Sequence, residues 1–399
     1  MRRLLILGAG RAQLPLLRSA RRLGLLVMAA DPDPSAPGFA LADASLCCDL
    51  ADEPRLVAEA RRWGASGALT FAADYPMPAL GVLCDTLGLA GPGSDTVLRA
   101  THKAHMRRAL ARAGVPCPAF EHVLDLDAAR AAARRIGGDI VVKPAQSSGG
   151  RGVTCVPAAA PATVLDAAFA HAAAYSRTGQ GVMVERCIAG PEFSIELICH
   201  RGKAYVLAVT DKLTTGAPHF VEVGHQQPSR LAPPERTAVE AAARDAVRAL
   251  GIDEAAAHVE LRLADEGPVI MEAAARAGGG CIASHLVPLS TGIDMVAACI
   301  AIALGDAPRL EPEGAPQAVA IRFITAAAGS FAGFSGIDDA QAMPGVVEVE
   351  TCVTAGQRIG RLVDATARCG HVIATGSTAA AAIACAEAAR DRIQVTLAS

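Results

Sequence analysis

The sequence predicts an α/β protein whose central part is of the α+β kind, and three observations lead to this class. Short apolar runs alternate with helical segments over residues 4–74, which is typical of a parallel sheet covered by helices. Pairs of apolar runs joined by short turns follow, as expected for antiparallel strands. A last strand, glycine turn and helix occupy residues 370–395. A chain of 399 residues favours two or three domains.

The N-terminal region begins with a glycine turn between two apolar runs. The first run covers residues 4–7, "GAG" follows, and the second run ends at Asp31 after a helix. This order also fits a dinucleotide-binding turn, but the G-x-G-x-x-G pattern has Gln13 in place of its third glycine. An NAD-dependent oxidoreductase is therefore an alternative that the first domain only partly supports. A third strand at 46–48, a helix at 55–64 and a fourth strand at 67–74 complete the region.

A stretch rich in Gly, Pro and Ser at 88–97 indicates a domain boundary. Helical composition then recurs four times, over residues 97–114, 125–138, 160–175 and 235–250. Strand patterns lie between these helices, over residues 140–144, 181–200, 203–212 and 258–276. The segment 181–200 reads as two strands around a Gly-Pro turn. The central region is therefore expected to be built mainly from antiparallel strands.

Composition excludes several classes of protein. The formal net charge is −3 and aromatic residues make up 3%, so we expect no nucleic-acid partner. Twelve cysteines are scattered without a C-x-x-C pair, which predicts neither a zinc knuckle nor disulfides, and we interpret them as packing residues in a cytoplasmic protein. The apolar start "RRLLILGAGR" is too short for a signal peptide, and we expect no membrane segment.

The stretch "IVVKPAQSSGGRGV" at 140–153 predicts a cradle for phosphate groups. Lys143 ends an apolar run, and the loop after it is nearly all backbone. Backbone N–H groups and one ammonium together suit a phosphate chain. Lys103 and Lys212 are two further candidates in a chain that otherwise uses arginine for most of its positive charge. Each lysine alone also fits a solvated surface position, and the stretch alone also fits a surface hairpin.

Two pairs of acids stand near strand ends. Glu185 and Glu192 flank a segment whose backbone, at Cys187 and Ile188, could hydrogen-bond a purine edge while the second acid takes ribose hydroxyls. A hairpin with solvated acids explains the same residues equally well.

Glu260 and Glu272 lie on two successive strands joined by a short turn. If these strands pair antiparallel, both carboxylates converge on one face and require a cation between them. Mg²⁺ favours one or two carboxylates together with substrate phosphates. Arg276 follows four residues later, and its planar fork suits a carboxylate or an acyl phosphate. A surface ladder of charges is the alternative.

The order of these features resembles the ATP-grasp superfamily over essentially the whole chain. The matching features are Lys103, Lys143 with "SSGG", the segment from Glu185 to Glu192, Lys212, Glu260, and "EAAAR" followed by "GGG". The stretch at 210–231 and the C-terminal "GHVIATGSTAAAA" resemble the L-amino acid ligase branch, which makes dipeptides. The resemblance implies a pre-ATP-grasp domain at 1–98, an ATP-grasp domain at 99–305 with a lid at about 139–190, and a C-terminal ligase subdomain at 306–399.

The resemblance also implies roles for matching residues. ATP would be held by Lys103, Lys143, Ser147, Ser148, Gly149, Gly150, Glu185, Cys187, Ile188, Glu192 and Lys212. Mg²⁺, with Mn²⁺ as a substitute, would be held by Glu260 and Glu272. The reaction would depend on Arg276, Lys143 and Lys212, with Glu222, His225 and Arg276 lining the substrate pocket. Many relatives have Asn two residues after the second metal-binding Glu, and Ala274 stands there in this chain.

The implied activity is an ATP-dependent carboxylate–amine ligase of the acid–amino acid type. It would form an acyl phosphate and pass the acyl group to an amine, giving a dipeptide or amide with ADP and phosphate. Its partners would be small-molecule acids and amines, and the alanine-rich helices would suit a homodimer. One alternative within the fold is a ligase or carboxylase acting on a purine precursor or another non-peptide acid. Another is a non-catalytic ATP-binding protein.

Overall fold

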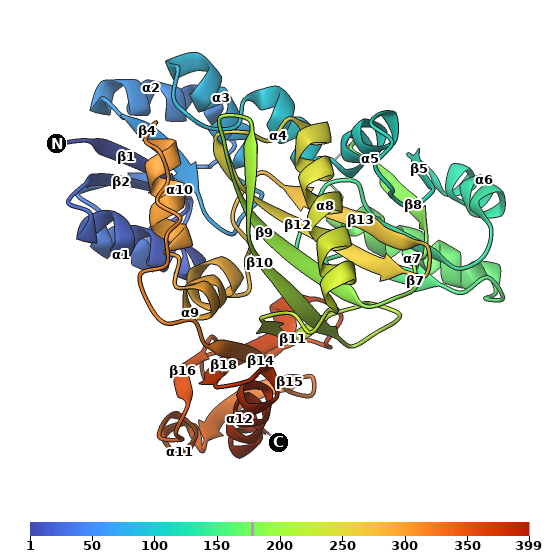
Figure 1. Cartoon of the computed structure of the whole chain (residues 1–399). Helices are drawn as coiled ribbons and strands as arrows, with labels where there is room; N and C mark the ends of the chain where they lie inside the picture. The colour runs from blue at the N-terminus through green and yellow to red at the C-terminus, as the bar shows by residue number, and fades with distance from the viewer. Residues whose placement is uncertain (177–178, 399) are drawn as a thin grey trace.

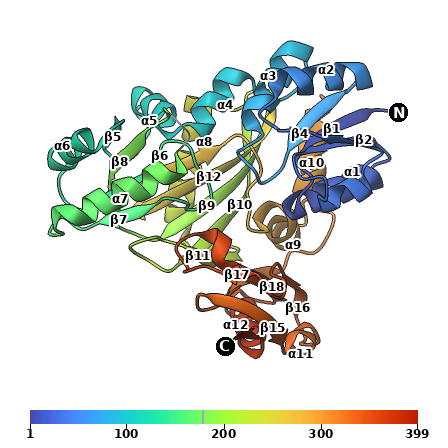
Figure 2. The same cartoon turned by 180° about the vertical axis from the view of Figure 1, so that it is seen from behind.

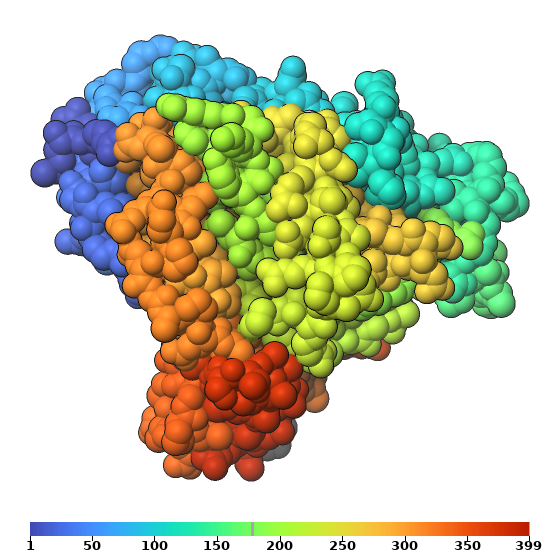
Figure 3. All heavy atoms as spheres, in the orientation of Figure 1, coloured from blue at the N-terminus to red at the C-terminus, as the bar shows by residue number. Residues whose placement is uncertain are grey.

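The chain folds into an N-terminal domain, a lid and a C-terminal subdomain arranged around one long central sheet (Figure 1). This computed structural model describes residues 1–176 and 179–398. The N-terminal domain and the lid lie at opposite ends of the central region, and the C-terminal subdomain projects from a third side (Figures 2 and 3).

The N-terminal domain has the parallel sheet that the sequence predicts. Its strand order is β3-β2-β1-β4, and both β1 neighbours run parallel to it. The strands are β1 (Arg3–Leu7), β2 (Leu26–Asp31), β3 (Ala44–Cys47) and β4 (Gly67–Thr70). The helices are α1 (Leu14–Arg22), α2 (Glu53–Trp63) and α3 (Met77–Leu87). The chain runs outward from β1 to β2 and β3, and then crosses over β2 and β1 to add β4 on the other side of β1.

Side chains of the N-terminal domain occupy the space around the glycine turn that follows β1. The Gln13 side chain donates to the Phe71 carbonyl at 2.5 Å and lies 3.1 Å from where a Cβ on Gly8 would stand. The Ala9 N–H donates to Asp31 at 2.7 Å. A dinucleotide pyrophosphate needs this space and these donors, so the turn that suggested NAD is occupied by side chains of the same domain.

The expected helix at 97–114 is two helices, α4 (Ser94–Thr101) and α5 (Lys103–Arg112). His102 between them is extended, with φ −108° and ψ 108°. The Lys103 N–H donates to the Ala145 carbonyl at 2.8 Å instead of continuing the helix. The break therefore places Lys103 beside the strand that carries Lys143.

The lid is a four-stranded sheet of order β5-β8-β6-β7 with two helices on it. The strands are β5 (Phe120–Val123), β6 (Ile140–Pro144), β7 (Thr154–Val156) and β8 (Val182–Arg186), and the helices are α6 (Leu126–Ile136) and α7 (Ala162–Tyr175). Because β5 pairs with β8, the sheet that contains the lid strands begins at Phe120. The lid buries its own apolar cluster, including Val142, Ala168 and Val184.

The central sheet has eight antiparallel strands in the order β13-β12-β9-β10-β11-β14-β18-β16. These are β9 (Glu192–His200), β10 (Lys203–Thr214), β11 (Glu222–Gln227), β12 (Ala255–Ala264), β13 (Gly267–Ala274), β14 (Ala318–Thr325), β16 (Val346–Thr351) and β18 (Arg368–Gly376). Since β11 pairs with β14, the sheet crosses the expected boundary at 306 without interruption. The strands β8 and β9, which read as one hairpin in the sequence, lie in different sheets.

Further elements cover the central sheet and complete the C-terminal subdomain. The helices are α8 (Pro233–Leu250), α9 (Val287–Thr291), α10 (Met295–Ala303), α11 (Ile337–Gln341) and α12 (Ala379–Arg392). The strands β15 (Gly329–Ser335), β17 (Arg358–Ile359) and β19 (Gln394–Leu397) form a small sheet. Buried residues of α10 and the N-terminal domain share one apolar cluster, so these two parts pack as one body, whereas the lid has a core of its own.

Among the helices described, no single one is long and apolar enough to cross a membrane. The segments Ile282–Thr291 and Met295–Ala303 reach the required length and composition only as a pair, with a bend of 118° between them.

The filled glycine turn generates a prediction about nucleotide choice. We expect isothermal titration calorimetry to show saturable binding of ATP with Mg²⁺ and no binding of NAD⁺, because Gln13 fills the space beside Gly8 and Asp31 accepts from the Ala9 N–H. Saturating heat with NAD⁺ and none with ATP would reverse the assignment of the first domain.

Candidate active site

The main cavity lies between the lid and the central sheet and has a volume of about 360 Å³. All but one of the residues singled out in the sequence line it. They are Lys103, Lys143, Ser147, Ser148, Gly149, Gly150, Cys187, Ile188, Glu192, Lys212, Glu222, His225, Glu260, Glu272 and Arg276. The lining holds seven Lys and Arg side chains and four Glu side chains, a surplus of three positive charges that suits an anionic ligand.

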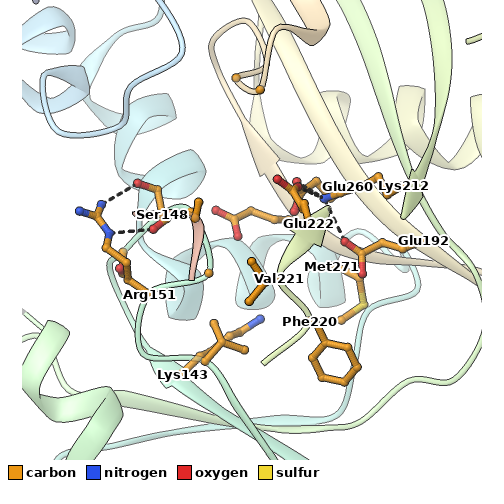
Figure 4. A pocket seen from close by; sticks show the side chains of 18 of the residues that line it. Lys143, Ser148, Arg151, Glu192, Lys212, Phe220, Val221, Glu222, Glu260 and Met271 are labelled. Carbon is orange, nitrogen blue, oxygen red and sulfur yellow. Dashed lines mark hydrogen bonds and ion pairs between the residues drawn. The ribbon is translucent and has the colours of Figure 1, made fainter. Parts of the chain in front are cut away.

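Lys212 on β10 is the centre of the charged network (Figure 4). Its Nζ lies 2.9 Å from Glu192, 2.7 Å from Glu222 and 2.6 Å from Glu260, and the side chain is 2% exposed. Burial alone would lower the pKa of this ammonium. The three carboxylates outweigh burial and raise the pKa well above its ordinary value, so Lys212 is a permanent cation that gathers three anions.

Glu260 and Glu272 are direct partners across the antiparallel strands β12 and β13. Both line the cavity, so the convergence expected from the sequence is confirmed. Burial would raise the pKa of Glu260, but Lys212 and His258 hold it well below its usual range. Glu272 accepts from Lys103 Nζ at 3.3 Å. Two carboxylates facing one cavity form an oxygen donor set that fits Mg²⁺.

Lys143 lines the cavity and is paired with Glu185, the one predicted site residue that does not line it. Glu185 is fully buried and accepts from Arg107 at 2.9 and 3.0 Å and from Lys143 at 2.8 Å. Burial would raise the pKa of Glu185, but these cations lower it to about 2. The predicted adenine contact by this side chain is therefore wrong, because both its oxygens are engaged below the cavity. Glu185 positions Lys143.

The glycine loop after β6 covers one side of the cavity. Lys103 Nζ donates to the Ser147 carbonyl at 2.8 Å. Arg151 folds back and donates to the Ser148 carbonyl and hydroxyl, both at 3.0 Å (Figure 4). Gly149 and Gly150 have φ of +66° and +75°, the left-handed region that favours glycine. Backbone N–H groups in such a turn can face a bound anion.

The segment between β8 and β9 links the lid to the central sheet. Cys187 and Ile188 line the cavity here. The Ile188 carbonyl accepts from Arg262 at 2.9 Å, and the same guanidinium donates to Glu192 at 3.0 Å. It also stacks 4.7 Å from the centre of the Phe220 ring. The solvated hairpin that the sequence left open is excluded, because the two strands belong to different sheets.

The far end of the cavity holds the predicted substrate residues. Arg276 makes a two-pronged ion pair with Asp74 of the N-terminal domain at 2.6 and 2.8 Å. Glu222 accepts from Arg368 at 2.9 Å. His225 is buried, and neither ring nitrogen has a hydrogen-bond partner among the described residues. Burial lowers the pKa of His225 to about 3, so a neutral imidazole with free polar atoms faces this end.

His258 completes the network behind Glu260 and was missed in the sequence. Its Nε2 lies 3.1 Å from Glu260, and its Nδ1 makes a short contact with Glu196. Burial would lower the pKa of His258, but these two acids raise it to about 10. The sequence offers one signal for this role, since His258 stands two residues before Glu260 on the same strand and therefore shares its face.

Comparisons with known proteins identify two domains in the chain. Residues 136–285 match the sequence profile of the ATP-grasp domain, so the chain carries an ATP-grasp domain. More particularly, residues 322–398 match the profile of L-amino acid ligase C-terminal domain 2, so the ATP-grasp domain is joined to the C-terminal domain of L-amino acid ligases.

Three similar proteins illustrate the range of this likeness. An L-amino acid ligase from Bacillus licheniformis has the same fold, with a TM-score of 0.85 and 24% identity over 100% of this chain and 99% of that one. "Uncharacterized protein y4rH" of Sinorhizobium fredii is 29% identical over 338 residues, 84% of this chain and 70% of that protein. Alanine–anticapsin ligase of Bacillus subtilis is 29% identical over 234 residues, 53% of this chain. The match spans only 48% of that ligase's length.

The buried ion pair beneath Lys143 generates a stability prediction. We expect Glu185→Gln to lower the free energy of unfolding at pH 7 by about 3–5 kcal/mol, because it leaves Arg107 buried without its anion. The matched control is Glu121→Gln, which breaks the surface pair with Arg135 and should cost less than about 1 kcal/mol.

The same variant has an expected pH dependence. The pKa of Glu185 is depressed from 4.5 to about 2, so its stabilisation is present above 4.5 and is lost as the pH falls toward 2. Urea unfolding at a series of pH values should therefore show that the difference in free energy of unfolding between Glu185→Gln and the wild type becomes smaller below pH 4.5. A difference that stays constant, or is no larger than that of the control, would contradict a structural role for this pair.

Proposed function

We propose that this protein uses ATP and Mg²⁺ to join the carboxylate of one amino acid to the amine of another, releasing ADP and phosphate. The observation that carries the proposal is the cross-strand pair of Glu260 and Glu272, which shares one cavity with Lys103, Lys143 and Lys212. Such a set of oxygens and ammonium groups suits a triphosphate and its metal ion.

The nucleotide would enter between the lid and the central sheet. The adenine would lie against Cys187 and Ile188, and Glu192 would accept from the ribose hydroxyls. The three lysines and the backbone of the glycine loop would receive the phosphates. These lysines are paired with Glu side chains, so nucleotide binding would exchange internal partners for phosphate oxygens.

The metal ion would be held by Glu260 and Glu272, with Mn²⁺ able to replace Mg²⁺ because both prefer oxygen ligands. When bound, it would neutralise charge on the phosphates during transfer. Ala274 lines the cavity two residues after Glu272, and its side chain supplies no amide oxygen to a metal ion.

The first step would join two anions, and the chain's cations make this feasible. An oxygen of the substrate carboxylate attacks the γ-phosphorus of ATP, the bond to the β-phosphate oxygen breaks, and ADP leaves. Lys143 and Lys212 would stabilise the charge that moves onto the phosphates. Arg276, held by Asp74, would orient the carboxylate and then the acyl phosphate through its planar fork.

The second step would form the amide. The amine nitrogen attacks the acyl carbon, inorganic phosphate leaves with the bonding electrons, and the nitrogen loses a proton. Glu222 and His225 lie where the amino acid substrates would bind, since both line the cavity near Lys212. The glycine loop and lid would exclude water, which would otherwise hydrolyse the acyl phosphate.

The metal-binding carboxylates can be tested separately from the fold. We expect Glu272→Gln to lower kcat about 10²–10³-fold, corresponding to ~3–4 kcal/mol of lost transition-state stabilisation, with little change in melting temperature. Glu266→Gln is the control, because Glu266 lies exposed on the turn of the same hairpin. Normal turnover in Glu272→Gln, measured as ADP release, would remove this residue from the mechanism.

A substrate panel tests the reaction itself. The protein, ATP and Mg²⁺ are mixed with pairs of amino acids, with single amino acids, and with non-peptide acids that include purine precursors. We expect phosphate release to require an amino acid pair, and the product mass to equal the two substrates less one water. Turnover only with a purine precursor would favour the alternative within the fold. No turnover with any substrate, despite ATP binding, would favour a non-catalytic role.

A further inference from the structure

One cation in the wall of the cavity has no role in the proposed reaction. The seven basic side chains that line the cavity are Lys103, Lys143, Lys212, Arg151, Arg262, Arg276 and Arg368. In the proposed reaction the three lysines receive the phosphates, and Arg276 orients the carboxylate that is activated. Arg262 donates to the Ile188 carbonyl at the adenine end, and Arg151 donates within the glycine loop. Of the seven, Arg368 is the one left without an assignment.

The C-terminal subdomain supplies Arg368 as the first residue of β18. The short helical turn before it begins at the buried Asp364, whose carboxylate accepts from the Thr366 N–H at 2.8 Å. The Ala365 N–H of this turn donates to the Gly149 carbonyl at 3.3 Å. The turn therefore contacts the glycine loop and holds Arg368 in the wall of the cavity.

The guanidinium of Arg368 is fixed in place but keeps one nitrogen available. Its Nε donates to the Glu222 carbonyl at 3.1 Å, and its Nη2 donates to the Glu222 carboxylate at 2.9 Å. The guanidinium carbon lies 3.8 Å from the centre of the Phe323 ring, a cation–π contact. Within residues 1–176 and 179–398, Nη1 has no hydrogen-bond partner. Two N–H donors of an oriented cation are thus left for a ligand.

The two arginines at the substrate end of the cavity are anchored to different parts of the chain. Arg276 is held by Asp74 of the N-terminal domain, whereas Arg368 belongs to the C-terminal subdomain. A reaction that joins two amino acids involves two α-carboxylates, because one reacts and the other remains in the product. Each is an anion that needs a cation when it leaves water, so the second carboxylate requires a basic group in addition to Arg276.

We propose that Arg368 binds the α-carboxylate of the amino acid that supplies the amine. This inference rests on the proposed ligase function. The carboxylate would accept from Nη1 in a charge-assisted hydrogen bond. The amine substrates are then free amino acids, and the product keeps a free C-terminal carboxylate. Amino acid amides and simple amines, which lack this group, are poor substrates.

The neighbouring His225 supports a polar ligand at this place. Its ring is buried, lines the cavity and lies 5.6 Å from the Phe323 ring on which Arg368 stacks. Neither ring nitrogen has a hydrogen-bond partner among the described residues. Leaving such atoms unpaired in the interior costs free energy, and a substrate amino group that donates to the imidazole would offset this cost. Arg368 and His225 would then contact the two polar ends of one amino acid.

The test compares an amino acid with its own carboxamide. The full chain, ATP and Mg²⁺ are given an amino acid pair that yields product and whose C-terminal partner has an uncharged side chain. That partner is supplied either as the amino acid or as its carboxamide, which can act only as the amine because it has no carboxylate to activate. We expect the wild-type kcat/KM to be at least about tenfold higher for the amino acid, the usual effect of one hydrogen bond to a charged group.

Changing Arg368 should remove this preference. Arg368→Ala should raise KM for the amino acid at least about tenfold and bring the two kcat/KM values within about threefold of each other, with KM for ATP unchanged. Arg368→Gln, which can still donate to Glu222, should have the same effect if the alanine variant does not fold. The matched control is Arg361→Ala, because Arg361 is exposed in the same segment and does not line the cavity. It should keep the wild-type preference.

Three results would overturn the assignment. The wild type could use the carboxamide as well as the amino acid, which needs no variant to observe. A folded Arg368 variant could keep the full preference for the amino acid. The variant could instead raise KM for ATP with the preference unchanged, which would assign Arg368 to the nucleotide. If the wild type joins no amino acids at all, the proposed ligase function is wrong and this inference falls with it, so the two failures are distinguishable.

Discussion

Charges that leave water must be neutralised by other charges, and the cavity of this protein is built around that constraint. Lys212 holds three carboxylates, Lys143 shares Glu185 with Arg107, and Arg276 is held by Asp74. An isolated buried ion costs several kcal/mol, so each group is tolerable only while its partner is present. The Arg276–Asp74 pair consequently ties the cavity to the N-terminal domain, while the other pairs hold strands together within the central sheet and within the lid.

This arrangement also explains how the site is prepared for a highly charged ligand. The lysines are already desolvated and oriented by carboxylates, so a triphosphate would replace one set of anions by another and would not have to strip water from free ammonium groups. Two of the carboxylates released in this exchange, Glu260 and Glu272, are those whose oxygens suit a divalent cation. The negative charge that a nucleotide would add is offset by the surplus of cationic side chains in the lining.

The positions of site residues could be predicted from the sequence wherever they depend on spacing along one strand or one hairpin. Glu260 and Glu272 could be paired in advance because a short turn sets their register, and the glycine loop beside Lys143 could be recognised from composition. Arg107 and Asp74 could not be foreseen, since their partners lie 78 and 202 residues away. The segment 181–200 was predicted to be a hairpin for the same reason. Its local sequence indicates a turn, but does not reveal that the two strands belong to different sheets.

The continuity of the central sheet carries a consequence for how this family of proteins can change. Because β11 is hydrogen-bonded to β14, cutting the chain before the C-terminal subdomain would leave β11 as an open edge, with unpaired N–H and C=O groups that invite association with other chains. The subdomain is thus not a module that can be deleted or traded at a linker. During evolution, the subdomain could be replaced only by another segment that supplies a strand in matching register with β11. The evolution of the subdomain is therefore tied to that of the central sheet.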